Sequence, residues 1–268
     1  MGQLGHGRVD LTQRLVGDVA IVTGGSQGIG RVVADRLAAE GAAVAILART
    51  EGTVRAAADE LAAAGAEALG VPCDVTDRAQ VRAAVERVIE RFGRLSILVN
   101  HAGVFRHAPF ADVSDEMWNE LLHVNLTGMF IVAQEVAREM IRLGAGGRIV
   151  NMSSAAAHMA HSDQMVYGVT KAGIEAMTRA MAFDLAPYGI VVNAVAPGTI
   201  QTSFSVGNLS REAVDERVRR IPLGRLGDPA EVAAVIAMLA SPDASYVTGV
   251  VIPIDGGLIT AGVRAPSA

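Results

Sequence analysis

The sequence predicts a single α/β domain built on a doubly wound parallel sheet of seven strands, with helices on both faces. Short runs of Val, Ile, Leu and Ala alternate with longer helical patterns along nearly the whole chain, as in successive βαβ units. These short runs are continuously apolar, which is typical of strands that are covered by helices on both sides. A length of 268 residues suits one large domain better than two independent ones.

The expected elements follow one another in a regular order. Helices are expected up to Glu40, through Ala64, over 78–92 and over 114–143, with further helices around the last two strands. We interpret residues 1–16 as an N-terminal extension, 17–268 as one domain, and 261–268 as a frayed tail. The seven strands are expected at residues 18–23, 43–47, 67–72, 96–100, 148–152, 190–195 and 247–254.

A polar, charged segment at about 199–221 interrupts this alternation. It follows the carboxyl end of a strand, where ligands of open α/β sheets bind, so we predict a small lid there. The alternative is a solvated loop that contains a short helix.

Composition and charge limit the possible partners. The net charge is -5 and the basic residues are scattered, which argues against binding to nucleic acid. No apolar run approaches the roughly 18 residues of a membrane span, so we expect no membrane association. The single cysteine, Cys73, fits a reducing cytoplasm, and core packing explains it better than a nucleophilic role.

A glycine-rich segment, TGGSQGIG, joins the first strand to the first helix. Its glycines let backbone amides approach a pyrophosphate at the positive N-terminus of that helix. The spacing differs from G-x-G-x-x-G, and glycines at such turns are also often purely structural. The candidate cofactor residues here are Thr23, Gly24, Ser26, Gln27, Gly28, Ile29 and Gly30.

The end of the second strand indicates which nicotinamide cofactor fits. A carboxylate at this point would bind the ribose hydroxyls of NAD, but the chain has Ala48 followed by Arg49. An arginine can pair with a 2′-phosphate through its planar fork, so NADP(H) is favoured and NAD(H) remains possible. The alternative is that Arg49 is an exposed, solvated side chain.

Tyr167, Lys171 and Ser154 predict the chemistry. The Tyr-x-x-x-Lys spacing puts phenol and ammonium on one helix face, where the positive charge is expected to lower the pKa of the phenol. A tyrosine tuned in this way can donate a proton when a hydride is transferred to a carbonyl. The hydroxyl of Ser154 is the candidate to stabilise the developing oxyanion.

Two histidines, His158 and His161, are spaced H-x-x-H between that serine and tyrosine. A metal would need further ligands and none is evident nearby, so no metal site is predicted. With Met159 and Gln164, these histidines either line the substrate pocket or form its rim, and the sequence leaves both alternatives open.

These motifs, together with CDV at 73–75, NHAG at 100–103, Asn125 in HVNLTG and Pro197-Gly198, resemble the short-chain dehydrogenase/reductase family over about residues 17–260. The resemblance implies a catalytic set of Asn125, Ser154, Tyr167 and Lys171, with Lys171 also holding the nicotinamide ribose. It also implies a homotetramer that uses the helix after Ser114 and the Tyr167 helix. Further cofactor contacts implied by the resemblance are Asp74, Val75, Asn100, Ala102, Gly103, Pro197, Gly198, Thr199, Ile200 and Thr202.

Two residues depart from the family pattern. His101 replaces the second asparagine of the usual NNAG, and Gln27 stands where many NADP-using relatives carry a basic residue. The second departure leaves Arg49 as the main charged support for a 2′-phosphate.

Residues 17–268 are therefore expected to form one dinucleotide-binding catalytic domain of Rossmann type. The activity that we expect is NADP(H)-dependent interconversion of a ketone and a secondary alcohol, on a small molecule and similar to 3-oxoacyl thioester reductases. Tyr167 would donate the proton. An NAD-dependent alcohol or sugar dehydrogenase is the alternative within enzymes, and a nucleotide-sensing protein without turnover is the alternative outside them.

Overall fold

The sheet of the computed structural model contains seven parallel strands in the order β3-β2-β1-β4-β5-β6-β7, which confirms the predicted fold. The structure describes residues 13–202, 207 and 210–260. Each strand lies at or near its expected place, because the continuous apolar runs that predicted the strands fill the core. The strands are β1 Val19–Thr23, β2 Ala43–Ala48, β3 Ala68–Pro72, β4 Ile97–Asn100, β5 Gly147–Met152, β6 Ile190–Pro197 and β7 Val251–Ile254.

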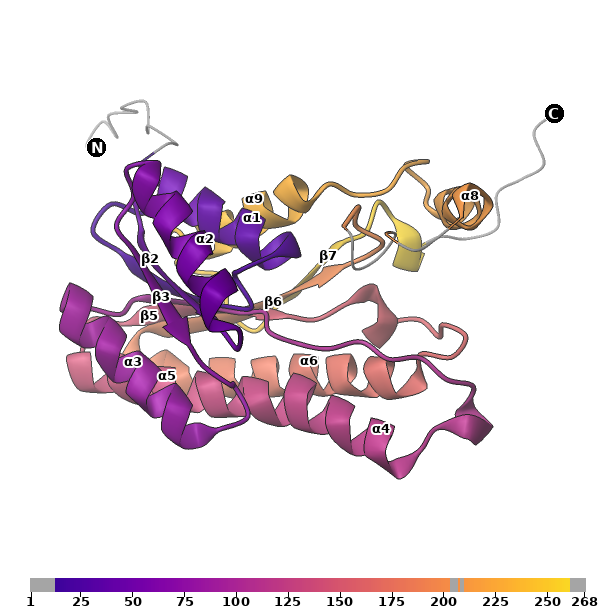
Figure 1. The fold of residues 1–268 in the computed structure, drawn as a ribbon, viewed down its shortest axis with the longest axis horizontal. Coiled ribbons are helices and arrows are strands. Elements are labelled where there is room, and N and C mark those ends of the chain that lie inside the picture. The colour runs from indigo at the N-terminus through magenta and orange to yellow at the C-terminus, as the bar shows by residue number, and fades with distance from the viewer. Residues whose placement is uncertain (1–12, 203–206, 208–209, 261–268) are drawn as a thin grey trace, which may run out of the picture.

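Helices cover both faces of this sheet (Figure 1). Helices α1, α2 and α9 lie on one face, and α3, α5 and α6 lie on the other. Each face has its own apolar core, since the strands send alternate buried side chains to the two sides. The helices are α1 Gly28–Ala39, α2 Glu51–Ala63, α3 Arg78–Phe92, α4 Asp115–Leu121, α5 Met129–Leu143, α6 Met165–Leu185, α8 Arg211–Arg220 and α9 Pro229–Leu239.

The strand order reverses beside β1, which pairs with β2 on one side and with β4 on the other. Because all strands are parallel, their carboxyl ends meet at one edge of the sheet. Thr23, Asn100, Met152 and Pro197 are the last residues of β1, β4, β5 and β6. This edge, at the reversal of strand order, is where ligands of open α/β sheets bind.

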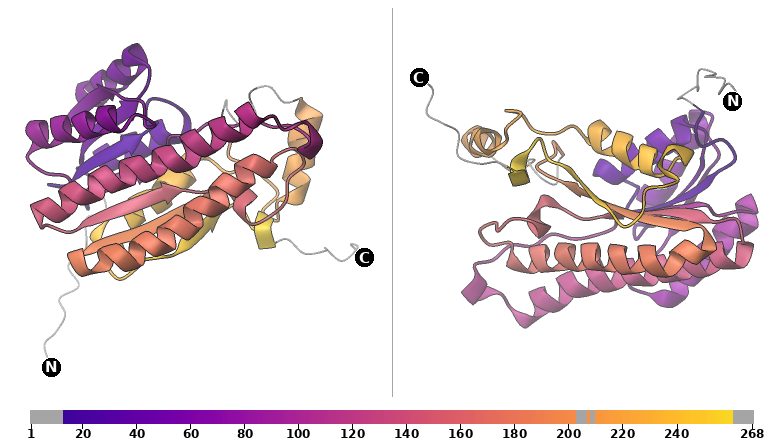
Figure 2. Two further views of the ribbon diagram at one scale, coloured as in Figure 1. Left: turned by 90° about the horizontal axis from the view of Figure 1, so that it is seen from below. Right: turned by 180° about the vertical axis from the view of Figure 1, so that it is seen from behind.

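The long helical stretch expected over 114–143 consists of two α-helices joined by a π-helical segment. Helix α4 is followed by a π-helix at Leu122–Gly128 and then by α5. Figure 2 (left) shows the three as one long magenta rod beside α6, which is orange. The expected helical stretch is therefore confirmed, and wider i→i+5 turns replace the α-helical ones in its middle.

Part of the expected N-terminal extension packs against the domain. Leu15 is fully buried, and Arg14 forms an ion pair with the buried carboxylate of Glu40 at 2.7 Å. Residues 1–12 and the expected tail at 261–268 lie outside the described residues.

The segment at 199–221 contains α8, whose first turn is capped by Ser210. The Oγ atom of Ser210 accepts a hydrogen bond of 3.3 Å from the amide of Ala213. Residues 203–206 and 208–209 of the predicted lid lie outside the described part. Of the helices that the structure describes, none has the length and apolar character needed to cross a membrane.

Candidate active site

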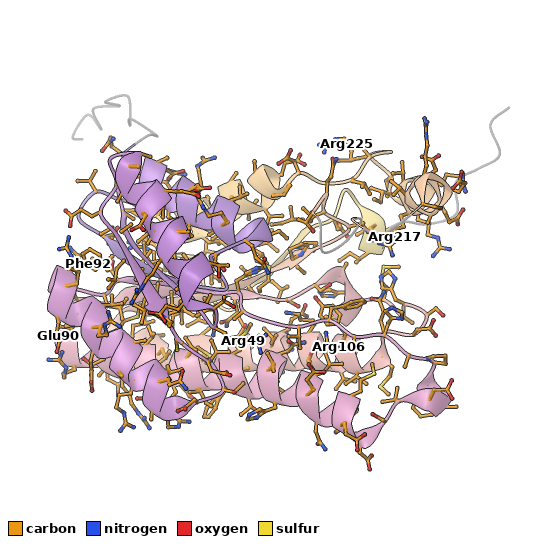
Figure 3. The ribbon with its side chains drawn as sticks, viewed as in Figure 1. Arg49, Glu90, Phe92, Arg106, Arg217 and Arg225 are labelled. Carbon is orange, nitrogen blue, oxygen red and sulfur yellow. The ribbon has the colours of Figure 1, made fainter. Side chains whose placement is uncertain are left out.

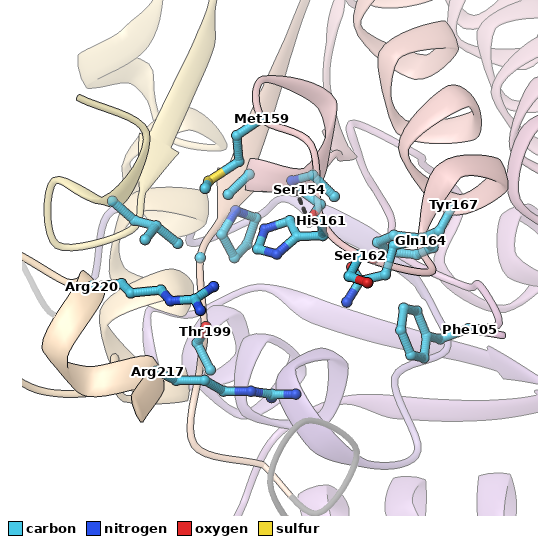
Figure 4. Close-up of a pocket in the computed structure, with 15 residues that line it drawn as sticks. Phe105, Ser154, Met159, His161, Ser162, Gln164, Tyr167, Thr199, Arg217 and Arg220 are labelled. Atoms are coloured by element: carbon cyan, nitrogen blue, oxygen red, sulfur yellow. Dashed lines mark hydrogen bonds between the residues drawn. The ribbon is translucent and has the colours of Figure 1, made fainter. Parts of the chain in front are cut away.

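Two cavities open at the carboxyl edge of the sheet, and Ser154, Tyr167, Pro197 and Gly198 line both of them. The first, which we call the glycine-loop cavity, has a volume of about 430 Å³ and extends along the loop after β1. The second, the α8 cavity, measures about 320 Å³ and lies between α8 and the start of α6 (Figure 4). The hydroxyls of Ser154 and Tyr167 therefore belong to residues at the junction of two binding spaces.

The glycine loop has the backbone that its sequence predicts. Gly24 and Gly28 have φ angles of +67° and +57°, in the left-handed region that favours glycine. A Cβ atom at Gly30 would collide with the carbonyl oxygen of Gly24, so only glycine fits there. Helix α1 starts at Gly28, and its N-terminal amides face the cavity that Gly24, Gln27 and Gly28 line, which suits a pyrophosphate.

Thr23 joins the end of β1 to the loop after β4, and Asn100 joins β4 to α5. The Oγ1 atom of Thr23 accepts hydrogen bonds from the amides of His101 at 2.9 Å and Ala102 at 3.0 Å. The side-chain amide of Asn100 donates to the carbonyl oxygen of Met129 at 2.8 Å. Both side chains are buried, and these hydrogen bonds join them to protein atoms.

Lys171 and Tyr167 lie on one face of α6, as their spacing predicts. The Nζ atom of Lys171 lies 5.5 Å from the centre of the Tyr167 ring and donates a hydrogen bond of 2.8 Å to the carbonyl oxygen of Met152. The ring of Phe105 meets the phenol ring edge to face, with centroids 5.1 Å apart. These contacts fix the position of the phenol between the two cavities.

The expected lowering of the pKa of Tyr167 by Lys171 does not occur in this structure. Burial raises the pKa of Tyr167 to about 12, and a hydrogen bond with Ser154 acts in the opposite direction. Burial also lowers the pKa of Lys171 to about 8, because its ammonium is only 3% exposed. Both shifts have one physical cause, which is that the protein surrounds the phenol and the ammonium and disfavours their charged forms.

The π-helical segment places Asn125. Its side chain is fully buried, accepts a hydrogen bond of 2.7 Å from the amide of Val104 and donates one of 2.9 Å to the carbonyl oxygen of the same residue. A 3.5 Å contact with Thr170 Oγ1 connects Asn125 to α6, one turn after Tyr167. The loop after β4 is thereby attached to the helix that carries the tyrosine.

Arg49 directly follows β2, and its side chain is exposed (Figure 3). Asp74 follows β3, and the Oδ1 atom of its carboxylate accepts two hydrogen bonds from Thr76, at 2.7 and 2.9 Å. Burial tends to raise the pKa of Asp74, but these bonds and the charge of Arg49 outweigh it, so the pKa is lowered. The positive charge of Arg49 thus reaches the carboxylate of Asp74.

Comparison with known proteins adds to this geometry. A family model described as enoyl-(acyl carrier protein) reductase matches residues 24–259, which include the glycine loop, Ser154, Tyr167 and Lys171. The chain belongs to the short-chain dehydrogenase/reductase family. This short-chain dehydrogenase/reductase is therefore an oxidoreductase with the doubly wound fold of its family.

Two curated relatives have different names. The 3-oxoacyl-[acyl-carrier-protein] reductase FabG of Thermotoga maritima is 42% identical over 253 residues, which cover 92% of this chain and 99% of the relative. The short-chain reductase protein NovJ of Streptomyces niveus is 40% identical, over 89% of this chain and 93% of the relative.

A solved structure of similar likeness is a gluconate 5-dehydrogenase from Burkholderia cenocepacia in complex with NADP and tartrate. It is 37% identical, has a TM-score of 0.89, and the match covers 94% of this chain and 99% of that one. A short-chain type dehydrogenase/reductase from Mycobacterium marinum is 38% identical with a TM-score of 0.88, over 92% and 97% of the two chains.

Most sequence-predicted cofactor residues of this short-chain dehydrogenase/reductase line the glycine-loop cavity. Thr199 lines the α8 cavity instead. The lining of neither cavity includes Thr23, Ser26, Gly30, Arg49, Asp74, Val75, Asn100 or Asn125. The predicted residues that line the glycine-loop cavity are Gly24, Gln27, Gly28, Ile29, Ala102, Gly103, Ser154, Tyr167, Lys171, Pro197, Gly198, Ile200 and Thr202.

The two histidines between Ser154 and Tyr167 lie in different surroundings. His161 lines the α8 cavity with Met159 and Gln164, whereas the Nε2 atom of His158 lies 2.8 Å from the carboxylate of Glu175. His101 lines the glycine-loop cavity, and burial lowers its pKa to about 4. Among the described residues, no three histidine, cysteine, aspartate or glutamate side chains converge as a metal site would require.

Sequence reasoning missed seven residues of the α8 cavity, namely Phe105, Ala155, Ala156, Ser162, Arg217, Arg220 and Leu258. The two arginines carried a detectable signal, because a spacing of three residues within the predicted lid puts both on one helix face. Phe105 and Leu258 gave none, since an isolated apolar residue in a loop has no periodic pattern around it.

Proposed function

We propose that this enzyme uses NADP(H) to interconvert a ketone and a secondary alcohol, with Tyr167 as the proton donor in reduction. The observation that carries the proposal is that Ser154 and Tyr167 line both cavities, one suited to a dinucleotide and the other to a small molecule. FabG, the 3-oxoacyl-[acyl-carrier-protein] reductase, and the gluconate 5-dehydrogenase that was solved with NADP support the same class of chemistry.

The residues present fit a nicotinamide dinucleotide. The amides at the start of α1 and the close approach of Gly24 and Gly30 suit a pyrophosphate, and Lys171 lines the same cavity further along. When bound, the cofactor supplies the hydride that adds to the carbonyl carbon. Arg49 follows β2 where a 2′-phosphate would meet a cation, which favours NADP(H) over NAD(H).

The protein contributes a proton, a hydrogen bond and an orientation. Tyr167 holds its proton through the neutral pH range, since burial raises its pKa to about 12, and can give it to the carbonyl oxygen as the hydride arrives. Ser154 donates a hydrogen bond to the same oxygen and stabilises its developing charge. Lys171, held by Met152, orients the ribose and places its positive charge below the phenol.

Asn125 completes the proposed set. Its amide binds Val104 and contacts Thr170, so it holds the loop after β4 against α6. We propose that Asn125 holds a water molecule of a proton relay behind Lys171.

Turnover on a panel of ketones, with NADPH and with NADH, tests the proposal. We expect oxidation of NADPH that depends on the ketone and that is lost in Tyr167→Phe. Cofactor binding without turnover of any ketone or secondary alcohol would favour a nucleotide-sensing protein instead. A clear preference for NADH and for oxidation would favour the alternative of an alcohol or sugar dehydrogenase.

We also propose that the chain assembles as a homotetramer in the cytoplasm, where its single cysteine stays reduced. Cys73 is buried and burial raises its pKa to about 12, which fits core packing. Trp118 on α4 and Phe183 on α6 are 37% and 83% exposed, and these two helices contact each other on one face. Light scattering coupled to gel filtration measures the number of chains directly.

A further inference from the structure

Two arginines of α8 line the cavity that contains the proposed proton donor. Arg217 and Arg220 are three residues apart and therefore share one face of the helix. Both side chains extend into the α8 cavity opposite Phe105, Gln164 and Tyr167 (Figure 4). The same helix carries Arg211 and Arg219, which do not line this cavity.

The charge of this cavity is one-sided. Among the described residues, its lining holds Arg217, Arg220 and His161, and neither an aspartate nor a glutamate. Burial lowers the pKa of His161, and the positive charges of Arg217 and Arg220 lower it further. The positive charges of both guanidinium groups therefore reach the part of the cavity that His161 lines.

One carboxylate outside the cavity helps to hold Arg220. The Nη2 atom of Arg220 lies 3.3 Å from Oε1 of Glu216, one helical turn earlier. A guanidinium has five N–H donors in a fixed fork, so this contact leaves donors that can bind an anion in the cavity. Glu216 also pairs with Arg219, which shares its charge between two arginines.

The neutral polar side chains complete the environment. Ser162, Gln164 and Thr199 lie around the same space, and its volume of about 320 Å³ suits a small molecule. A cavity with two arginines and several neutral donors favours a ligand that carries negative charge as well as a carbonyl group.

We propose that Arg217 and Arg220 bind the carboxylate of the substrate while its carbonyl lies against Ser154 and Tyr167, so that the substrate is a small oxo acid. This inference rests on the proposed function. In the reduction, bound NADPH would supply the hydride for the ketone carbon and become NADP⁺. The C=O π electrons would move to oxygen, which would take the proton of Tyr167, and the proposed relay behind Lys171 would restore that proton. The product is the corresponding hydroxy acid.

The test measures binding separately from turnover. Straight-chain oxo acids with the ketone at positions 2 to 5, and their matched amides, are titrated calorimetrically into enzyme saturated with NADP⁺, where no reduction occurs. We expect at least one acid to bind about ten times or more tighter than its amide. Arg217→Gln and Arg220→Gln should each remove most of this difference, and Arg219→Gln on the same helix should keep it.

Several outcomes would overturn the proposal. Acids and amides that bind alike, or do not bind at all, would show that the arginines do not select a carboxylate. An equal loss in Arg219→Gln would reduce the effect to a general helix charge. A third arm uses phosphopantetheine thioesters of 3-oxo acids, and if only these depend on the two arginines, the bound anion is a phosphate and the oxo acid assignment is wrong.

The proposed function can fail independently of this inference. Reduction of neutral ketones, together with oxo acids that bind no tighter than their amides, would keep the proposed function and remove the carboxylate site. If the enzyme binds acids selectively but its Tyr167→Phe variant still reduces ketones, the carboxylate site is kept and the proposed role of Tyr167 is removed.

Discussion

The ammonium of Lys171 donates a hydrogen bond of 2.8 Å to the carbonyl oxygen of Met152, the last residue of β5. This bond ties the middle of α6 to the carboxyl edge of the sheet. It uses one of the three donors of the ammonium, which leaves two for the hydroxyls of a ribose. Lys171 is thus positioned by the sheet and available to the glycine-loop cavity at the same time.

Lys171→Ala should damage both cofactor affinity and the chemical step, whereas Ser154→Ala should mainly lower kcat. The lysine has two proposed roles, while the serine only stabilises the oxyanion, and removal of such a donor costs about 10²-fold or more. Dissociation constants of NADPH and steady-state kinetics for both variants separate the two effects. An unchanged dissociation constant in the lysine variant would exclude its role in ribose binding.

Raising the pH above about 8 should weaken NADPH binding and ketone reduction. Burial lowers the pKa of Lys171 to about 8, so its charge is present below that pH and is lost above it. Tyr167, whose pKa is raised to about 12, stays protonated over the same range. The measurement is NADPH affinity between pH 6 and 10, with Lys171→Met as the variant that should bind weakly at every pH.

The lowered pKa of Lys171 also makes the free energy of unfolding depend on pH. An unfolded lysine keeps its proton up to about pH 10.5, whereas folded Lys171 releases it near 8. The unfolded state therefore binds more protons between these values, and the contribution of Lys171 to the free energy of unfolding rises with pH there. If the affinity of the wild type for NADPH stays constant from pH 6 to pH 10, the low pKa of Lys171 is contradicted.

Tyr167→Phe should abolish turnover while cofactor binding stays nearly intact, because only the hydroxyl is removed and the ring contact with Phe105 is kept. General acid catalysis is typically worth about 10²-fold or more. Single-turnover rates and NADPH titrations measure both properties. Residual activity above about a tenth of wild type would disprove the assignment of the proton donor.

Arg49→Ala should reduce the preference for NADPH over NADH, and Ala48→Asp should reverse it. A charge-assisted bond to a phosphate contributes about 1.5 to 3 kcal/mol, or roughly tenfold to over a hundredfold. The exposure of Arg49 places the effect toward the lower end of this range. The ratio of kcat/KM for the two cofactors is the measurement, and a ratio unmoved by Arg49→Ala would mean that the side chain is only solvated.

Leu15→Ala should destabilise the protein, by about 2 to 5 kcal/mol for a fully buried leucine. Val16→Ala is the matched control. The side chain of Val16 is 64% exposed, so its truncation should change the free energy of unfolding little. Thermal unfolding of both variants at one protein concentration tests this. Equal melting temperatures would mean that the segment before β1 adds nothing to the core.

The sequence predicts the sheet, and it predicts that Ser154, Tyr167 and Lys171 meet at the edge of the sheet, because both have local signals. Continuous apolar runs mark buried parallel strands, and the Tyr167–Lys171 spacing marks one helix face. It could not predict the pKa of Tyr167, because burial depends on chain segments far away in sequence, including Phe105. The sign of that shift was therefore wrong.

The remaining differences have similar causes. The π-helix around Asn125 has no sequence signature in a pattern that reads as one helix from 114 to 143. Arg217 and Arg220 read as charged surface until the fold brings α8 over the cavity. Leu15 lies before the first strand, where periodicity is too short to show that one side chain is buried.

Lys171 is the only lysine among the 268 residues. Isotopic labelling of lysine therefore gives a side-chain resonance from one residue, and that residue lies between the sheet edge and the phenol. The chemical shift of its ammonium can be followed through a titration without any assignment experiment. In this protein, a uniform amino-acid label acts as a site-specific probe of the active centre.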